Sequence, residues 1–198
     1  MWKQLSIALF CAVAFASCDD DNDEDYPSIV TQFVDIESNA EGRFFRITND
    51  QEQTYLITNS MEGYEPNTVY RSICGYVPQG NQATIYQLSA VQMLRDSTSV
   101  ARHDPIAVNS VWHAGKYINM QLAPRTQGGT QFWGYQIDSL RPGHLFLSLH
   151  HNQNGDPTSY TQNVYACILL ERIAGYSEGD SITLAIATFG GTKNFKMK

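Results

Sequence analysis

The cysteine at position 18 is the residue with the clearest chemical role in this sequence. It follows the small residues Ala16 and Ser17, which end an apolar run that begins at Leu5. This order predicts a secretory signal peptide that a lipoprotein signal peptidase cuts once the thiol of Cys18 has been diacylated. The run is shorter than the about 20 apolar residues that a membrane-spanning helix needs. We therefore predict that residues 1–17 are removed and that Cys18 carries lipid, and the alternative is an ordinary cleaved signal with an incidental cysteine.

Carboxylates crowd the segment directly after this cysteine. Residues 19–25 hold five Asp and one Glu, with Asp19, Asp20 and Asp21 first and no basic residue. Such a segment repels itself and buries no apolar surface, so residues 18–27 are predicted to form a solvated acidic tether. Fully extended, residues 19–27 reach on the order of 30 Å. Outside this segment and Lys3, the chain holds 14 acidic and 12 basic residues, so the net charge of −7 does not describe the folded part.

A histidine pair followed by a polar loop is the second candidate for chemistry. His150 and His151 precede a loop in which Asn152, Asn154 and Asp156 present oxygen atoms at alternate positions. A calcium loop of the EF-hand type needs more carboxylates than this one. Neighbouring residues of a strand point to opposite faces, so the two histidines cannot bind one ion together. We expect a structural turn here and no metal site.

The remaining polar residues do not form a recognisable catalytic pattern. His103, His113 and His144 are scattered, whereas a zinc site needs three or four converging ligands. The chain has no Gly-x-Ser-x-Gly motif of a serine hydrolase. We therefore predict no catalytic residues and no cofactor. A hydrolase that uses His150, His151 and Asp156 is kept as a third hypothesis.

Aromatic residues are concentrated in the second half of the chain. Trp112, Tyr117, Phe132, Trp133 and Tyr135 could form a platform on which sugar rings stack. Large aromatic side chains are also common in β-sandwich cores, because each buries a large apolar area. We expect Trp112 and Trp133 to belong to the core, and their exposure decides between the two interpretations.

Two cysteines, Cys74 and Cys167, remain after the signal peptide and the lipidated residue are set aside. Both lie in apolar stretches and neither belongs to a Cys-x-x-Cys motif. A disulfide between them is possible, but free cysteine often behaves as a small core residue. We expect two buried free thiols.

The first part of the folded chain reads as five strands. Alternation from residue 29 places Ile29, Thr31, Phe33 and Asp35 on one face of a strand and Val30, Gln32, Val34 and Ile36 on the other. Further strands are predicted at 43–48, 54–58, 69–77 and 83–94, with the one opening for a helical turn at 59–67. This order is typical of a small OB-type barrel. We place this domain at 28–102, with residues 95–104 as a linker.

The second part of the chain reads as a domain of about seven strands at 103–198. Strands are predicted at 107–113, 116–123, 130–140, 145–150, 163–172 and 182–189, with a short last strand that ends at Met197. Turn residues separate them at intervals of 8–12 residues, which indicates an antiparallel β-sandwich. The mature protein is therefore predicted to be all-β: a five-stranded OB-type barrel followed by an antiparallel β-sandwich.

Several short motifs together resemble the NigD-like lipoproteins. These are Cys74-Gly75-Tyr76-Val77-Pro78, Val111-Trp112, Tyr117-Ile118-Asn119-Met120-Gln121, Gly128-Gly129, Phe132-Trp133-Gly134-Tyr135 and the run from His151 to Pro157, with the acidic segment after Cys18. The resemblance implies an N-terminal OB domain and a C-terminal β-sandwich. It also implies a link to bacteriocin immunity in a Gram-negative anaerobe, and it offers no catalytic residues. In that bacterial group, Asp19, Asp20 and Asp21 resemble a signal for export to the outer face of the outer membrane.

Two functions are compatible with these features. The first is a non-enzymatic lipoprotein of the cell surface, anchored in the membrane by lipid on Cys18, that binds another protein. The second is a glycan-binding accessory lipoprotein that uses exposed aromatic side chains. Residues 26–100 carry four Arg and no Lys against eight acidic residues, so we expect no nucleic acid partner despite the barrel.

Overall fold

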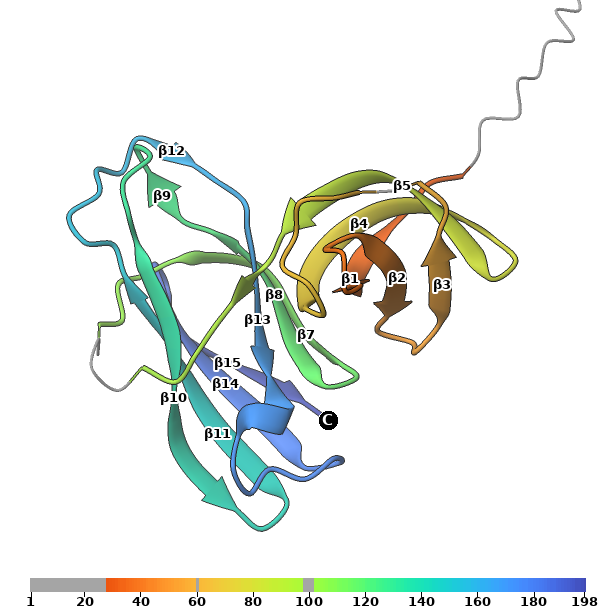
Figure 1. Cartoon of the computed structure of the whole chain (residues 1–198). Helices are drawn as coiled ribbons and strands as arrows, with labels where there is room; N and C mark the ends of the chain where they lie inside the picture. The colour runs from red at the N-terminus through yellow and green to blue at the C-terminus, as the bar shows by residue number, and fades with distance from the viewer. Residues whose placement is uncertain (1–27, 60, 98–101) are drawn as a thin grey trace, which may run out of the picture.

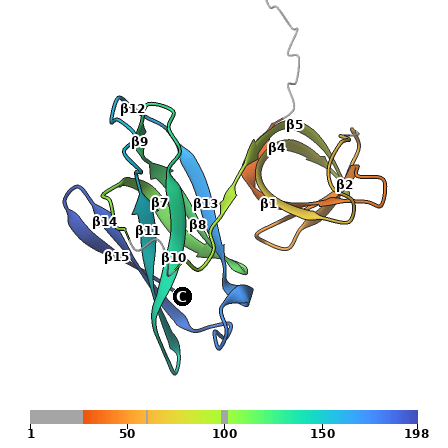
Figure 2. The ribbon, with the colours of Figure 1, turned by 60° about the vertical axis from the view of Figure 1, so that its left-hand side comes forward.

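The first half of the folded chain is a closed β-barrel. The computed structural model describes residues 28–59, 61–97 and 102–198. Five strands close the barrel in the order β1-β2-β3-β5-β4 (Figures 1 and 2). Their bounds are β1 (Val30–Ser38), β2 (Phe44–Asn49), β3 (Thr54–Ile57), β4 (Val69–Gln79) and β5 (Gln82–Ala90). The prediction of a five-stranded barrel is confirmed.

The alternation along β1 and β4 separates the barrel core from an outer face. Val34 and Ile36 of β1 and Cys74 and Tyr76 of β4 point inward and are buried in the barrel core. Because the side-chain period of a strand is two, the residues between them point outward. Phe33 lies opposite Ile73 and Asp35 opposite Arg71 in the antiparallel register of the two strands. The outer face of β1 and β4 therefore carries both apolar and charged side chains.

The second half is a sandwich of two four-stranded sheets. One sheet has the order β10-β11-β14-β15, the other has the order β6-β13-β8-β7, and β9 and β12 form a separate pair. The bounds are β6 (Gln92–Met93), β7 (Ala107–Ala114), β8 (Tyr117–Ala123), β9 (Arg125–Thr126), β10 (Phe132–Arg141), β11 (His144–Asn152), β12 (Tyr160–Thr161), β13 (Val164–Leu169), β14 (Ser181–Thr188) and β15 (Gly191–Met197), with a 3₁₀ turn η1 (Leu170–Arg172). Met120, Leu147, Ile168 and Leu184 are fully buried between the sheets. The predicted sandwich is confirmed.

Two strand pairs of the sandwich depart from the antiparallel prediction. β11 pairs with β14 in parallel, and β6 pairs with β13 in parallel. The chain between β11 and β14 crosses to the other sheet, where it forms β13, before it returns. A crossover of this length allows two neighbouring strands to run in the same direction, which a hairpin does not.

The chain enters the sandwich about ten residues before the domain boundary that the sequence predicts. The fifth barrel strand was predicted to run to Leu94, but β5 ends at Ala90. Leu94 is buried in the sandwich core, and Ser97 donates a backbone hydrogen bond to Tyr135 of β10. Contact with the sandwich therefore begins at Gln92, ahead of the boundary placed at residue 102. Apolar residues recur at Ile85, Leu88, Val91 and Leu94 with no turn signal between them, which is why the sequence did not show the change of domain.

Candidate functional site

The outer face of the barrel packs against the outer face of one sandwich sheet. Strand β8 is buried along most of its length and β13 at Ala166, Cys167 and Ile168, because one face lies in the sandwich core and the other faces the barrel. Tyr117 and Asn119 of β8 contact the barrel residues Asp35 and Arg71. This junction is the candidate functional site, because it combines buried charges with an open cavity.

Arg71 is the centre of the junction. Its side chain is 2% exposed. One terminal nitrogen, Nη1, donates to Asp35 at 3.3 Å, and the other, Nη2, donates to Asp50 at 2.5 Å. Nη2 also donates to the amide oxygen of Asn119 at 3.0 Å. A buried guanidinium with carboxylate and amide partners is far more stable than an unpaired one, because the partners replace the water that burial removes.

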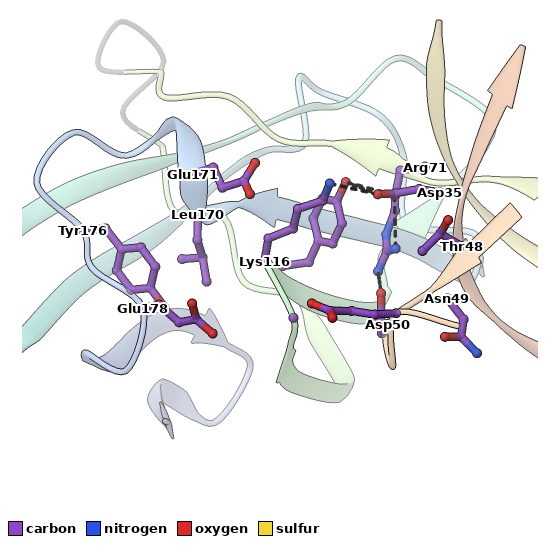
Figure 3. A pocket seen from close by; sticks show the side chains of 13 residues that line it. Asp35, Thr48, Asn49, Asp50, Arg71, Lys116, Leu170, Glu171, Tyr176 and Glu178 are labelled. Carbon is purple, nitrogen blue, oxygen red and sulfur yellow. Dashed lines mark hydrogen bonds and ion pairs between the residues drawn. The ribbon is translucent and has the colours of Figure 1, made fainter. Parts of the chain in front are cut away.

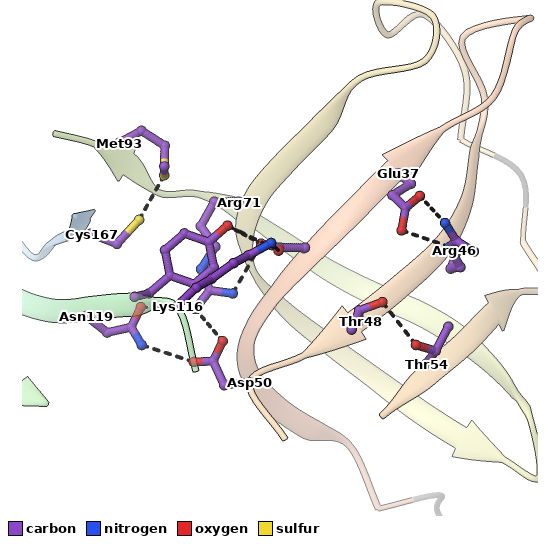
Figure 4. Close-up of polar contacts among 12 residues, drawn as sticks. Glu37, Arg46, Thr48, Asp50, Thr54, Arg71, Met93, Lys116, Asn119 and Cys167 are labelled. Atoms are coloured by element: carbon purple, nitrogen blue, oxygen red, sulfur yellow. Dashed lines mark hydrogen bonds and ion pairs between the residues drawn. The ribbon is translucent and has the colours of Figure 1, made fainter. Parts of the chain in front are cut away.

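The sandwich completes this network from the other side (Figure 4). The Tyr117 hydroxyl donates to both carboxylate oxygens of Asp35, at 2.9 and 3.1 Å. Asn119 Nδ2 donates to Asp50 Oδ2 at 3.0 Å, and Lys116 Nζ lies 3.2 Å from Asp35 Oδ2. Every one of these contacts joins a residue of the barrel to a residue of the sandwich. The network therefore ties the two domains together through side chains.

The charges of this network are balanced within it. Two carboxylates, Asp35 and Asp50, face two cations, Arg71 and Lys116. Burial raises the pKa of Asp50, and the Arg71 charge opposes that shift without cancelling it. Burial also raises the pKa of Tyr117, and the adjacent Asp35 charge raises it further, so the phenol stays neutral and acts as a donor.

A cavity of about 490 Å³ opens beside the network (Figure 3). Asp50, Arg71 and Lys116 line it together with Leu170 and Tyr176 of the sandwich. Three further acidic residues line it and are exposed to solvent: Glu52 of the barrel and Glu171 and Glu178 of the sandwich. A cavity with an acidic opening fits a cationic group, such as the end of a lysine or arginine side chain.

The predicted histidine pair belongs to a different region and is buried. His150 Nδ1 lies 2.9 Å from the Ser97 carbonyl oxygen. His151 Nδ1 lies 3.0 Å from the Asp104 carbonyl oxygen, and its Nε2 lies 2.8 Å from Gln131 Oε1. Burial lowers the pKa of His151, so this ring is neutral at pH 7. The two rings of β11 therefore hold the backbone at Ser97 and at Asp104 through hydrogen bonds to carbonyl oxygens.

Asp156 has a structural role in the loop that follows. Its carboxylate accepts hydrogen bonds from the Thr126 hydroxyl, the Gln131 amide and the backbone N–H groups of Gln127 and Gly129. These donors lower its pKa to about 2, with the Thr126 hydroxyl as the largest cause. The Asp156 carboxylate and the Asn152 side-chain oxygen therefore accept hydrogen bonds from protein donors. Among the described residues, no three His, Cys, Asp or Glu side chains gather as metal ligands would.

The five aromatic residues do not form the platform that was the alternative to a core position. Tyr117 and Tyr135 are buried, and Phe132 is 46% exposed at the start of β10. Trp133 is half-buried against the sandwich core and stacks on His151 with ring centroids 4.2 Å apart. Trp112 is half-buried outside that core, at the junction with the barrel. The prediction of a core position thus describes Trp133 better than Trp112.

The junction residues Asp35, Asp50 and Arg71 were not predicted from the sequence as site residues. One signal was present, because the alternation of β1 placed Asp35 and Phe33 together on the face turned away from the barrel core. An aspartate and a phenylalanine on one outer face indicate a surface that another element covers.

The expectation of two free thiols holds: Cys74 and Cys167 are buried and unbridged, and burial raises the pKa of each to about 12.

The predicted anchor lies outside the described residues. Cys18, Asp19, Asp20 and Asp21 fall in residues 1–27, so the signal peptide and the tether stay predictions. Among the described residues, no helix is long and apolar enough to cross a membrane.

Comparisons with known proteins point to one family. The model of the NigD-like C-terminal beta sandwich domain matches residues 89–198. A NigD-like immunity protein from Bacteroides caccae ATCC 43185 has a similar structure, with 22% identity and a TM-score of 0.65 over 86% of this chain and 92% of that one. A protein from Bacteroides fragilis NCTC 9343, described as a candidate lipoprotein, has 12% identity and a TM-score of 0.62 over 86% of this chain and 98% of that one. No curated protein matches the sequence.

Proposed function

Because the chain belongs to the NigD-like family, we propose that it is a surface-anchored, non-enzymatic lipoprotein that binds another protein. The observation that carries this proposal is the junction centred on Arg71. A buried network joins the barrel to the sandwich, so the two domains present one continuous surface with a cavity between them. Surfaces that are rigid before binding lose less entropy when a partner docks.

The predicted anchor supports a position at a membrane surface. Lipid on Cys18 would hold the chain there, and the acidic tether would keep the barrel on the order of 30 Å or less from the lipid. Asp19, Asp20 and Asp21 would direct the lipoprotein to the outer face of the outer membrane. The Bacteroides caccae protein is described as a NigD-like immunity protein, and we propose a bacteriocin, which the sequence resemblance implies, as the class of partner.

The charge of the cavity supports a basic partner. Lys116 and Arg71 are already paired with Asp35 and Asp50, so the carboxylates of Glu52, Glu171 and Glu178 dominate the opening. A basic side chain of a partner could place its apolar stem against Leu170 and Tyr176 and its charge among these carboxylates. We propose the cavity beside Arg71 as the place where this partner docks.

The test is capture of a partner by the full chain displayed on intact cells. Replacing Glu171 and Glu178 with Lys reverses the charge at the cavity and should weaken capture by about tenfold or more, which corresponds to about 1.4 kcal/mol. The control is Glu41→Lys, an equally exposed change in the turn after β1, at the other end of the barrel strands from Asp50. Equal loss in both variants, or no loss in either, would contradict the proposed site.

A survival assay tests the immunity role separately. Cells that carry the protein should survive a bacteriocin that kills cells without it, and Cys18→Ala should remove that protection. Survival that does not depend on the protein would reject immunity while leaving protein binding open.

A second function, binding of a glycan, is favoured by one specific observation. Trp112 is half-buried and lies beside a second hollow at the junction, where Tyr165 also contributes to the lining. A partly exposed tryptophan in a concave site is well placed to stack on a sugar ring.

A further inference from the structure

A second hollow of about 550 Å³ lies between the barrel and the sandwich. It shares Asp50 with the cavity beside Arg71, but its other lining residues are different. The barrel contributes the outer face of β1 and the turn after β2, and the sandwich contributes the end of β7 and part of β13. We call this hollow the Trp112 groove. Its volume lies within the range of about 300–1,000 Å³ that is usual for small-ligand sites.

Three aromatic rings line one part of the Trp112 groove. The ring of Phe33 lies 5.3 Å from the ring of Trp112 and 6.0 Å from the ring of Tyr165, edge to face in both pairs. Phe33 is 6% exposed, whereas Trp112 and Tyr165 are half-buried. The buried ring therefore supports two rings that solvent can reach.

The network around Arg71 fixes the position of these rings. The Arg71 guanidinium lies 5.3 Å from the centroid of Phe33. Trp112 pairs across β7 and β8 with Asn119, which binds both Arg71 and Asp50. Side chains held by such contacts need little rearrangement when a ligand arrives.

The polar groups of the groove are neutral and partly unused. His113 lies opposite Ile118 of the sandwich core, so its side chain is on the face of β7 away from Trp112 and its buried Nε2 does not serve the groove. Gln32 donates its amide nitrogen to Tyr76, while Thr31 and Gln51 are exposed. Among the described residues that line the groove there is no Lys or Arg, and its one carboxylate, Asp50, is already paired. The groove thus offers hydroxyl and amide groups beside aromatic surface.

We propose that the Trp112 groove binds a neutral sugar ring of a glycan. A pyranose has an apolar C–H face, which can stack on Trp112 or Tyr165, and a rim of hydroxyl groups that both donate and accept hydrogen bonds. Those hydroxyls can pair with the exposed side chains of Thr31 and Gln51 at the rim of the groove. This inference rests on the glycan-binding function proposed above and is independent of the protein partner.

Other ligand classes fit the groove less well. An apolar side chain from a protein would cover the Thr31 hydroxyl and the Gln51 amide without pairing with them, which costs free energy. A phosphate or an acidic sugar would meet the Asp50 carboxylate and no cation free to bind it. A neutral sugar satisfies the polar groups and adds no charge.

The test uses the fluorescence of Trp112 in the full chain. The sequence has three tryptophans, Trp2, Trp112 and Trp133. Trp2 lies in the predicted signal peptide, so Trp133→Phe leaves Trp112 as the only reporter in the processed protein. The probes are glucose, galactose, mannose, N-acetylglucosamine and their short oligomers. We expect at least one of them to change the Trp112 emission in a saturable way, with a dissociation constant on the order of 1 mM for a monosaccharide.

Variants assign the binding to the groove. Trp112→Ala should weaken binding of that sugar, followed by NMR or calorimetry, by about tenfold or more. Tyr160→Ala is the matched control, because Tyr160 is 53% exposed in β12 and does not line the groove. Thr31→Ala, at an exposed position, tests the polar rim without disturbing the rings. Trp112→Ala should leave protein capture through Glu171 and Glu178 unchanged.

Three results would overturn the proposal. The first is that no neutral sugar changes the emission of Trp112. The second is that sugar binding is the same in Trp112→Ala and in the unchanged protein. The third is that an apolar peptide binds the groove and the sugars do not, which would assign the groove to a protein partner. A failure of the capture experiment would leave these results unaffected.

Discussion

The guanidinium carbon of Arg71 lies 3.9 Å from the ring centroid of Tyr117, so a cation of the barrel stacks on an aromatic ring of the sandwich. The hydroxyl of the same tyrosine donates to Asp35, which is itself paired with Arg71. One residue of the sandwich thus contacts both members of a barrel ion pair. This arrangement explains why a charged pair is stable on the outer face of a barrel, where the sandwich removes it from water.

Replacing Arg71 should destabilise the whole protein. Arg71→Met leaves Asp35 and Asp50 with only Lys116 as a cation, and breaking a buried ion pair in this way costs about 3–5 kcal/mol. Urea unfolding measures the loss. The control is Arg43→Met, because the pair of Arg43 with Glu62 is more than half exposed and should contribute about 1 kcal/mol or less. Similar losses in the two variants would show that the junction does not depend on the network.

Asp156 should contribute to the stability of the fold at neutral pH, and this contribution should be lost in acid. Its pKa is about 2 in the folded chain, against about 3.9 for an unfolded aspartate. The unfolded state binds the proton first, so this stabilisation is present above pH 4 and is lost as the pH falls toward 2. Asp156→Asn should lower the melting temperature at pH 7, and the difference from the unchanged protein should shrink toward pH 2. Parallel melting curves over this pH range would contradict the assignment.

His151 should make the protein less stable in mild acid. Burial lowers its pKa below the ordinary value of about 6.5, so the unfolded chain takes up a proton at a higher pH than the folded chain. Stability is therefore lost as the pH falls below about 6.5. His151→Phe, which keeps a ring beside Trp133, should reduce the pH dependence of the unfolding free energy between pH 7.5 and 5.5. An NMR titration midpoint of His151 at or above 6.5 would reject this explanation.

Lipid attachment should depend on one thiol. Cys18→Ala removes the sulfur that the diacylglycerol would modify, so metabolic labelling with a palmitate analogue should fall to background. Cys11→Ala, a cysteine within the predicted signal peptide, is the matched control and should leave the label unchanged. Undiminished label in Cys18→Ala would remove the basis for a lipoprotein.

Display on the cell surface should depend on the first three carboxylates of the tether. Replacing Asp19, Asp20 and Asp21 with Ala should leave the lipid label intact and keep the protein inside the outer membrane. Protease treatment of whole cells reports the difference, because only displayed protein is digested. Replacing Asp23, Glu24 and Asp25 instead removes the same charge and should have a smaller effect. Equal digestion of both variants and the unchanged protein would mean that the acidic run is only a spacer.

Local patterns in the sequence were sufficient to predict the strands. The alternation of Phe33 and Val34 separates the two faces of β1 without reference to any other part of the chain, and turn residues mark where most strands end. They were not sufficient at residues 91–94, where apolar residues continue without a turn signal while the chain leaves the barrel for the sandwich.

By itself, the sequence determined an all-β chain in which a five-stranded barrel precedes a sandwich. It also determined that Asp35 and Phe33 lie on the same outward face of the first barrel strand. The tertiary structure alone decided what covers that face. Asp35 meets Tyr117 across 82 residues of chain, and Arg71 meets Asn119 across 48. The periodicity of apolar residues shows which face of a strand is apolar, because the face of each residue depends only on its position relative to its sequence neighbours. The pairing of a buried charge depends on which surfaces come together in space, and no local pattern contains that information.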